Sequence, residues 1–177
     1  MASDPVTRAA LATARNSKYN LPHPFRLMDA EVTLTRGNAV AETILRLLRE
    51  ATTSVDAALC RFNNPRLAAA LEDAGQRGVR VRLVLDRNKY EESRTTREVL
   101  AKGSTPFRLL YGRRGPGTKM HHKFALLDGR TALAGSYNWT IESEEQNYEA
   151  LLILREPELV ETLRQEFEAL WAEAAGP

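Results

Sequence analysis

The hydrophobic residues of this chain repeat with two different spacings. Apolar positions three and four residues apart predict amphipathic helices, whereas apolar positions two apart or in short unbroken runs predict strands. Helices are expected after Asn38, from Pro65, over residues 90–102 and from Pro157, and three of these starts carry a capping side chain or a first-turn proline. Strands are expected over residues 31–36, 55–62, 79–85, 107–111, 121–127, 131–134 and 148–154.

The connections between these strands indicate how the sheet is built. Strands separated by a helix favour parallel neighbours, whereas the hairpin signal Asp128-Gly129 joins two strands that must be antiparallel. The last strand, 148–154, is apolar on both faces, as in a sheet that is covered on both sides. We therefore expect an α/β fold with a mixed β-sheet flanked by helices on both faces, formed by a single domain at 29–177. Residues 1–28 carry three prolines and no sustained period, so they are expected to form an irregular N-terminal arm.

Composition agrees with an ordinary globular protein. The 177 residues are 43% hydrophobic and 27% charged, which suits one domain with a substantial core. The single cysteine, Cys60, excludes a disulfide framework within one chain. No apolar run approaches the roughly 18 residues that a membrane span needs. A cytoplasmic protein without stable membrane insertion is expected.

Charge is unevenly distributed along the chain. The formal net charge is only +2, but no acidic residue occurs from Val99 to Leu127. The basic residues of this segment are Lys102, Arg108, Arg113, Arg114, Lys119 and Lys123. Such a stretch is either a solvated surface or a contact region for an anion, and the charge pattern leaves both open.

The catalytic candidates follow at the end of this basic segment. His121 and Lys123 are two apart on an expected strand, so their side chains would leave the same face about 6.6 Å apart, with His122 on the opposite face. An imidazole and an ammonium placed this way can act on one phosphate. Neighbouring histidines on opposite faces cannot chelate one ion, and no cysteine cluster is present, so neither a metal nor another cofactor is expected.

A longer motif surrounds this pair. The pattern His121-x-Lys123-x4-Asp128-x6-Gly135-Ser136-x-Asn138 resembles the HKD signature of the phospholipase D superfamily. The segment Asn147-Tyr148-Glu149 resembles the strand of that family that carries a glutamate. The resemblance implies a phospholipase D-like fold and a two-step displacement through a phosphohistidine.

Roles for individual residues follow from the same resemblance. His121 would be nucleophile or acid, and Lys123, Ser136 and Asn138 would bind phosphate. Glu149 is an isolated carboxylate in an apolar strand, so we expect it to pair with and orient His121, the alternative being an edge-exposed glutamate.

Asp128 and Gly135 are interpreted as structural members of the motif. Asp128 lies an odd number of residues from His121 and sits at the turn, so it would point away from the histidine.

The chain holds one copy of the motif, whereas the implied mechanism uses two histidines. A chain with a single copy resembles the single-motif Nuc-type and zucchini-type endonucleases, and this resemblance implies a homodimer with a shared site. The cysteines needed for the zinc-binding insert of zucchini-type relatives are missing.

A nuclease is favoured because Arg113, Arg114 and Lys119 would contact nucleic acid, DNA or RNA, with single strands favoured. The nearby Glu142, Glu144 and Glu145 would weaken this basic field. Two alternatives stay open: a phospholipase D-type cardiolipin hydrolase, and a non-catalytic nucleic-acid-binding or scaffold module.

Overall fold

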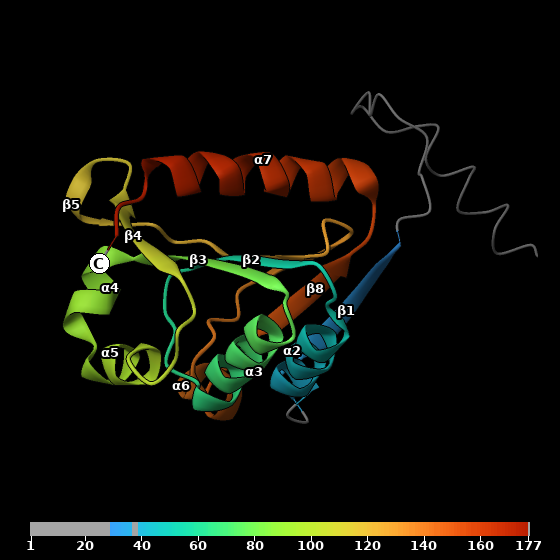
Figure 1. Cartoon of the computed structure of the whole chain (residues 1–177). Coiled ribbons are helices and arrows are strands. Elements are labelled where there is room, and N and C mark those ends of the chain that lie inside the picture. Colours follow the sequence, from blue (N-terminus) through green and yellow to red (C-terminus); the bar gives the residue numbers. More distant parts are fainter. Residues whose placement is uncertain (1–28, 37–38, 177) are drawn as a thin grey trace, which may run out of the picture.

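A mixed β-sheet lies at the centre of the structure, a computed structural model that describes residues 29–36 and 39–176 (Figure 1). The strands are β1 (Ala30–Leu34), β2 (Ser54–Leu59), β3 (Arg80–Asp86), β4 (Phe107–Gly112), β5 (Gly115–Lys119), β6 (Lys123–Leu127), β7 (Thr131–Gly135) and β8 (Ala150–Leu154). The helices are α2 (Ala39–Glu50), α3 (Pro65–Gln76), α4 (Arg87–Glu92), α5 (Arg94–Leu100), α6 (Ile141–Glu145) and α7 (Pro157–Glu173). The eight strands lie in the order β1-β8-β7-β6-β2-β3-β4-β5.

The connections explain which neighbours are parallel. Helices separate β2 from β3 and β3 from β4, and both pairs are parallel. The turn at Asp128 and Gly129, where φ is 54° and 61°, closes the antiparallel β6–β7 hairpin. Because β6 runs against β2, the start of β6 lies beside the carboxyl end of β2. His121 and Lys123 therefore lie at this end of the sheet, whereas Asp128 of the same motif lies at the other end, beside the start of β2.

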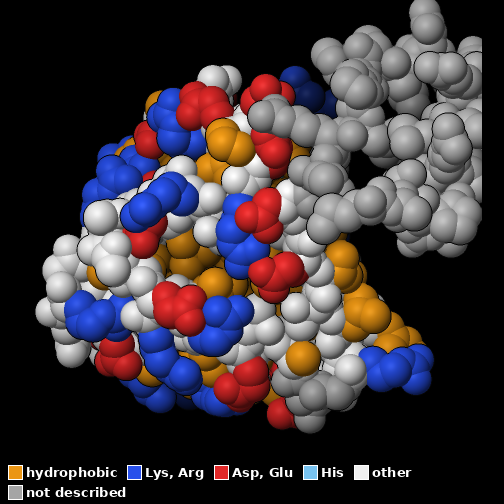
Figure 2. Space-filling view, turned by 90° about the vertical axis from the view of Figure 1, so that its right-hand side faces the viewer, with side chains coloured by type: hydrophobic (Ala, Val, Ile, Leu, Met, Phe, Trp, Pro, Cys, Tyr) orange, Lys and Arg blue, Asp and Glu red, His pale blue; other side chains and the backbone are white. Residues whose placement is uncertain are grey.

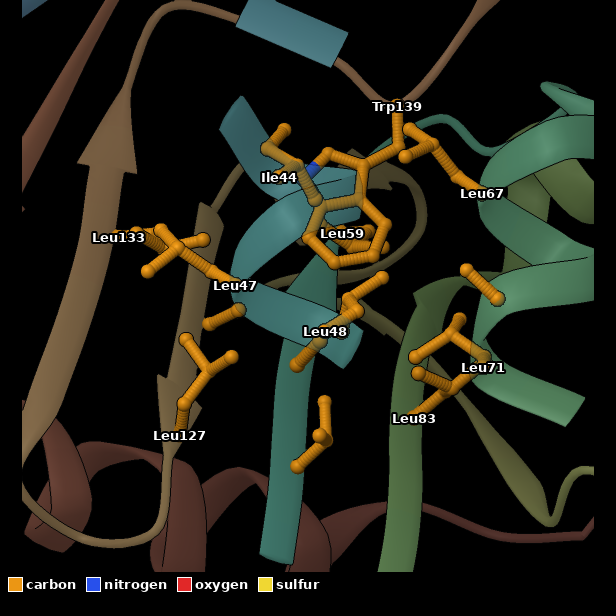
Figure 3. Packing of buried hydrophobic residues seen from close by; sticks show 14 of the residues in the cluster. Ile44, Leu47, Leu48, Leu59, Leu67, Leu71, Leu83, Leu127, Leu133 and Trp139 are labelled. Carbon is orange, nitrogen blue, oxygen red and sulfur yellow. The ribbon is translucent and has the colours of Figure 1, made fainter. Parts of the chain in front are cut away.

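Helices cover both faces of the sheet, as the sequence predicted. Helices α2 and α3 lie on one face, and α7 lies on the other (Figure 1). On the first face, the fully buried side chains of Ile44, Leu48 and Leu67 surround Trp139, as Figure 3 shows. Burying each such aliphatic side chain contributes about 1.5–3 kcal/mol, so this layer holds the helices on the sheet. Trp139 directly follows Asn138, and the core therefore anchors the end of the motif.

A buried ion-pair network attaches α7 to the opposite face. Arg82 of β3 donates to Asp56 at 2.7 Å and to Glu168 of α7 at 2.7 Å. Its guanidinium also lies over the rings of Phe167 and Trp171. Arg82 and Asp56, the two largely buried side chains of this network, are thus paired with opposite charges, as buried charges must be.

Four local expectations were wrong in detail. The helix expected at 90–102 is two helices, because Ser93 ends α4 and its hydroxyl accepts the Thr96 N–H at 3.1 Å to begin α5. The strand expected at 121–127 begins at Lys123. No strand was expected between residues 111 and 121, but β5 lies there and pairs with β4.

The fourth difference is α6, which no periodicity indicated because it has only five residues. Thr140 caps it by accepting the Ser143 N–H at 3.2 Å. The predicted N-terminal arm and the Asn38 cap lie outside the described residues.

Candidate active site

His121 lies in the irregular segment between β5 and β6. The adjacent backbone is fixed by β2: Leu59 pairs with Lys123, and the Cys60 N–H donates to the His122 carbonyl at 2.8 Å. The Lys123 ammonium donates to the His121 carbonyl at 2.8 Å. Backbone pairing with β2, in place of a strand through His121, therefore positions the two catalytic candidates.

The electrostatic surroundings favour a neutral imidazole. The pKa of His121 is lowered, first by the Lys123 charge, then by desolvation and by the Lys119 charge. The pKa of Lys123 is itself lowered, mainly by burial, while the charge of Glu149 opposes this shift. An imidazole that stays unprotonated near neutral pH is suited to act as a nucleophile.

His122 has different partners from His121. Its Nε2 lies 3.0 Å from a carboxylate oxygen of Glu166 on α7, and its ring meets Phe124 edge-on. Both histidines nevertheless line one groove, because His121 lies outside β6 and the alternation expected of a regular strand does not extend to it. Within residues 29–36 and 39–176, no group of three or more potential ligand side chains could hold a metal ion.

Ser136 and Glu149 face each other across β7 and β8. The Ser136 hydroxyl donates a short hydrogen bond to Glu149 Oε2. Glu149 Oε1 accepts from Ser143 Oγ at 3.4 Å and from Asn147 Nδ2 at 3.3 Å. A hydrogen bond between Glu149 and His121, which the sequence led us to expect, is not found in the described part of the chain. The glutamate instead orients the serine and acts on Lys123 through its charge.

The structure explains the residue types found at positions 135 and 138, Gly135 and Asn138. A Cβ atom at Gly135 would lie 2.1 Å from the Ala150 carbonyl oxygen, so only glycine permits this approach of β7 to β8. The Asn138 Oδ1 atom is buried and makes no hydrogen bond in the described structure. This oxygen is therefore not committed to holding the fold.

Asp128 is structural and lies away from the histidine. Its carboxylate accepts hydrogen bonds from the backbone N–H groups of Thr52, Thr53 and Ser54, the shortest at 2.7 Å, and from both threonine hydroxyls. These bonds hold its pKa well below the usual range, against the opposing effect of burial. The carboxylate joins the β6–β7 turn to the start of β2.

The basic residues predicted to contact nucleic acid divide into two groups. Arg113 and Arg114 are exposed in the turn between β4 and β5. Lys119 ends β5 close enough to His121 to lower its pKa. A groove of about 1000 Å³ is lined on one side by Arg87, Arg113, Lys119 and His121, and on the α7 side by Glu166 and Glu173. The β4–β5 hairpin, which carries Arg113, Arg114 and Lys119 and is called the basic hairpin below, therefore adjoins the candidate nucleophile.

The opposite end of the sheet has a different surface. On the face turned toward the viewer in Figure 2, Lys and Arg side chains are interspersed with Asp and Glu. No field of one sign dominates there, and the basic hairpin is at the other end of the sheet, beside β4 (Figure 1).

Arg61 and Asp86 were missed by sequence reasoning. Arg61 follows the carboxyl end of β2, and its charge lowers the pKa of both His121 and Lys123. Asp86 ends β3 and accepts the Met120 N–H at 2.7 Å. A polar residue at the end of a buried parallel strand was the available signal. The β2–β6 register brings Arg61 beside the motif, and the hydrogen bond to Met120 places Asp86 there.

Comparisons with known proteins agree with this arrangement. Residues 44–171 match the family described as cardiolipin synthase, PLD-like domain. The chain is 36% identical over 138 residues to the mitochondrial cardiolipin hydrolase of Homo sapiens, covering 78% of this chain and 53% of that protein. The chain spans about half the length of the curated relatives it matches.

Solved structures show the same fold. Nuc from Salmonella typhimurium, a phospholipase D family member, superposes with a TM-score of 0.76 at 24% identity, over 84% of this chain and 97% of that one. NucT from Helicobacter pylori gives 0.74 at 22% identity, over 84% and 100%. No described helix is long and apolar enough to cross a membrane.

Proposed function

Because the chain belongs to the phospholipase D superfamily, we propose that it is a metal-independent phosphodiesterase that cleaves nucleic acid at a site shared by two subunits. The observation that carries the proposal is the pair His121 and Lys123. The imidazole has a lowered pKa, and an ammonium group is held against its backbone carbonyl. This pair supplies a nucleophile and a cation without a bound metal.

The chemistry proceeds in two displacements. His121 of one subunit attacks phosphorus, a nitrogen–phosphorus bond forms, and the bond to the leaving oxygen breaks. The leaving oxygen takes its proton from His121 of the second subunit. Water then attacks the phosphohistidine, gives that proton back to the second imidazole, and releases a phosphomonoester and free His121. Lys123 and Asn138 hold the equatorial oxygens. Ser136 donates its one hydroxyl proton to Glu149, and its part in phosphate binding requires that this proton turn to the substrate.

Nucleic acid is the substrate that the basic hairpin supports. Arg113 and Lys119 line the groove that contains His121, and cations along a groove bind a phosphate backbone. The β5 strand begins Gly115-Pro116-Gly117, and apart from the small ring of Pro116 it carries no apolar or aromatic side chain that would enter a bilayer. A groove of this kind suits a single strand of DNA or RNA.

Cardiolipin hydrolysis is a second candidate because relatives of this chain carry that name. The same two displacements would cleave a lipid phosphodiester. The two functions differ in the part of the substrate that flanks the scissile phosphate, which is a nucleic-acid chain in one and a lipid in the other.

A substrate panel distinguishes them. Purified protein is incubated in EDTA with single-stranded and double-stranded DNA, RNA, bis(p-nitrophenyl) phosphate and cardiolipin vesicles, with His121→Ala as the inactive control. We expect cleavage of the chromogenic ester and faster cleavage of single strands than of any other polymer or of lipid. Cardiolipin hydrolysis faster than any nucleic-acid cleavage would replace the first function by the second.

A further inference from the structure

A second cavity lies beside the candidate active site. It encloses about 370 Å³ between the carboxyl ends of β2 and β3, helices α4 and α5, and the start of α6, a size typical of small-molecule sites. Cys60 and Asp86 line it. Asp86 also accepts the N–H of Met120, the residue before His121, so the cavity and the nucleophile share one wall.

Only one cation of this cavity lacks a partner among the described residues. Lys89 makes a short ion pair with Glu92, and Arg94 pairs with Glu98 at 2.6 Å. Arg61 makes no hydrogen bond or ion pair to any residue in the described part of the chain. A guanidinium that has carboxylates within electrostatic range but no hydrogen-bonded partner keeps its N–H donors available for an anion from outside the protein.

The position of Arg61 connects the cavity with the reaction centre. Beyond the end of β2, the antiparallel pairing of Leu59 with Lys123 brings the chain past His122, so Arg61 comes beside His121. Its charge lowers the pKa of His121 and Lys123, and also that of Glu92 and Glu142 on the cavity wall. The Arg61 charge therefore acts both on the catalytic pair and on the carboxylates of the cavity wall.

The remainder of the cavity is polar and carries charges of both signs, those of Asp86, Lys89, Glu92, Arg94 and Glu142. The hydroxyl-bearing side chains of Ser93, Thr95 and Thr140 line it, together with the ring of Tyr90, which packs against Phe107 at a centroid distance of 5.5 Å. Hydroxyl groups and an aromatic ring are the groups that bind sugars and bases. A ligand with one anionic end and a polar, ring-bearing body fits this distribution.

We propose that this cavity binds the nucleotide next to the scissile phosphate and that Arg61 holds the neighbouring, non-scissile phosphate. The inference rests on the proposed nuclease function and names a specificity subsite for it. Two phosphates joined by one nucleoside would then occupy His121 and Arg61 together. The enzyme would prefer substrates with a second phosphate over those with a single phosphodiester.

The test compares three substrates of known phosphate number. Bis(p-nitrophenyl) phosphate and the dinucleotide TpT each have one phosphate, and the trinucleotide TpTpT has two. We expect kcat/KM of the wild type to be about tenfold or more higher for TpTpT than for TpT. Arg61→Gln should remove this advantage, lowering kcat/KM for TpTpT about tenfold more than for the chromogenic ester, whereas Arg61→Lys should keep part of it.

Two further variants make the test specific. Arg46→Gln is the matched control, since Arg46 is an exposed residue of α2 paired with Glu50, and its kinetics should equal those of the wild type. Thr95→Trp narrows the cavity from an exposed helix position without touching the core or the catalytic pair, and it should also reduce the preference for TpTpT.

Each other result overturns the inference. An equal loss on TpTpT and on the chromogenic ester would place Arg61 at the scissile phosphate, and no loss on either would remove it from the site. A wild type that cleaves the chromogenic ester but neither nucleotide would refute the nuclease function itself. A wild type that cleaves TpT and TpTpT equally would refute only the second-phosphate subsite.

Discussion

The carboxylate of Asp86 accepts a 2.7 Å hydrogen bond from the backbone N–H of Met120, the residue directly before His121. Asp86 is completely buried, and its second oxygen accepts the Lys89 N–H at 2.8 Å. In Asp86→Asn only one oxygen remains, so one of these N–H groups would face an amide NH2. We expect a stability loss of about 2 kcal/mol, measured by urea unfolding.

Asp86→Asn should also shift the pH dependence of kcat/KM. The Asp86 charge raises the pKa of His121, so its removal should shift both limbs of the kcat/KM profile to lower pH. Asp73→Asn, at an exposed position of α3, is the matched control. A destabilised variant with an unmoved profile would reduce Asp86 to a purely structural residue.

Lys119→Gln should shift the profile in the opposite direction. Lys119 lowers the pKa of His121, so loss of its charge should raise that pKa and move both limbs to higher pH. The profile reports the coupled pair of histidines rather than either one. Lys102→Gln, an exposed residue just beyond α5, should leave the profile in place. A downward shift for Lys119→Gln would show that this lysine does not face the histidine.

Removal of the catalytic pair should abolish turnover in EDTA. His121→Ala eliminates the nucleophile and Lys123→Ala the adjacent cation, so each should lower kcat roughly a thousandfold or more with little loss of folded protein. Lys102→Ala, at an exposed position just beyond α5, is the matched control and should leave kcat close to that of the wild type. Activity that is lost in EDTA and restored by a divalent metal would refute the proposed chemistry.

Asp128→Ala should destabilise the fold without changing the chemistry. It leaves the N–H groups of three residues at the start of β2 without their acceptor, at a cost of about 2–3 kcal/mol at neutral pH. The folded-state pKa of Asp128 is depressed, so its contribution is complete above the unfolded pKa of about 3.9 and is lost as the pH falls toward the folded value.

The stability difference between wild type and Asp128→Ala should therefore narrow below about pH 4. Urea unfolding at neutral and acidic pH measures it, with Asp73→Ala as the control. A difference that is the same at both pH values would contradict the assigned hydrogen bonds, and a large fall in kcat of the folded variant would contradict a structural role.

A shared site should give a quadratic mixing curve. Wild-type and His121→Ala chains are unfolded together and refolded at varying ratios. If nucleophile and acid come from different subunits, only dimers of two intact chains turn over, and activity per total protein falls as the square of the wild-type fraction. A linear fall, or full activity at the mass of one chain in light scattering, would show that each subunit acts alone.

Much of the fold and of the motif could be predicted from local patterns. The two-residue spacing of His121 and Lys123, the turn at Asp128 and the close approach at Gly135 depend on residues near one another in the chain. The mixed sheet with helices on both faces follows from hydrophobic periods and one hairpin signal. Each of these signals lies within about a dozen residues, which is the range over which the backbone geometry of one element acts.

The partners across the site depend on strand order and register instead. Glu149 pairs with Ser136 because β7 and β8 are neighbours, and Arg61 reaches His121 because β2 pairs with β6. Nothing in the local sequence of either strand specifies which distant strand it will meet, since apolar strands of similar pattern are compatible with several neighbours. The packing of the whole sheet between its helices selects one arrangement. That arrangement gives the motif its electrostatic surroundings, and it places at the cavity the Arg61 guanidinium, which has no hydrogen-bonded partner among the described residues.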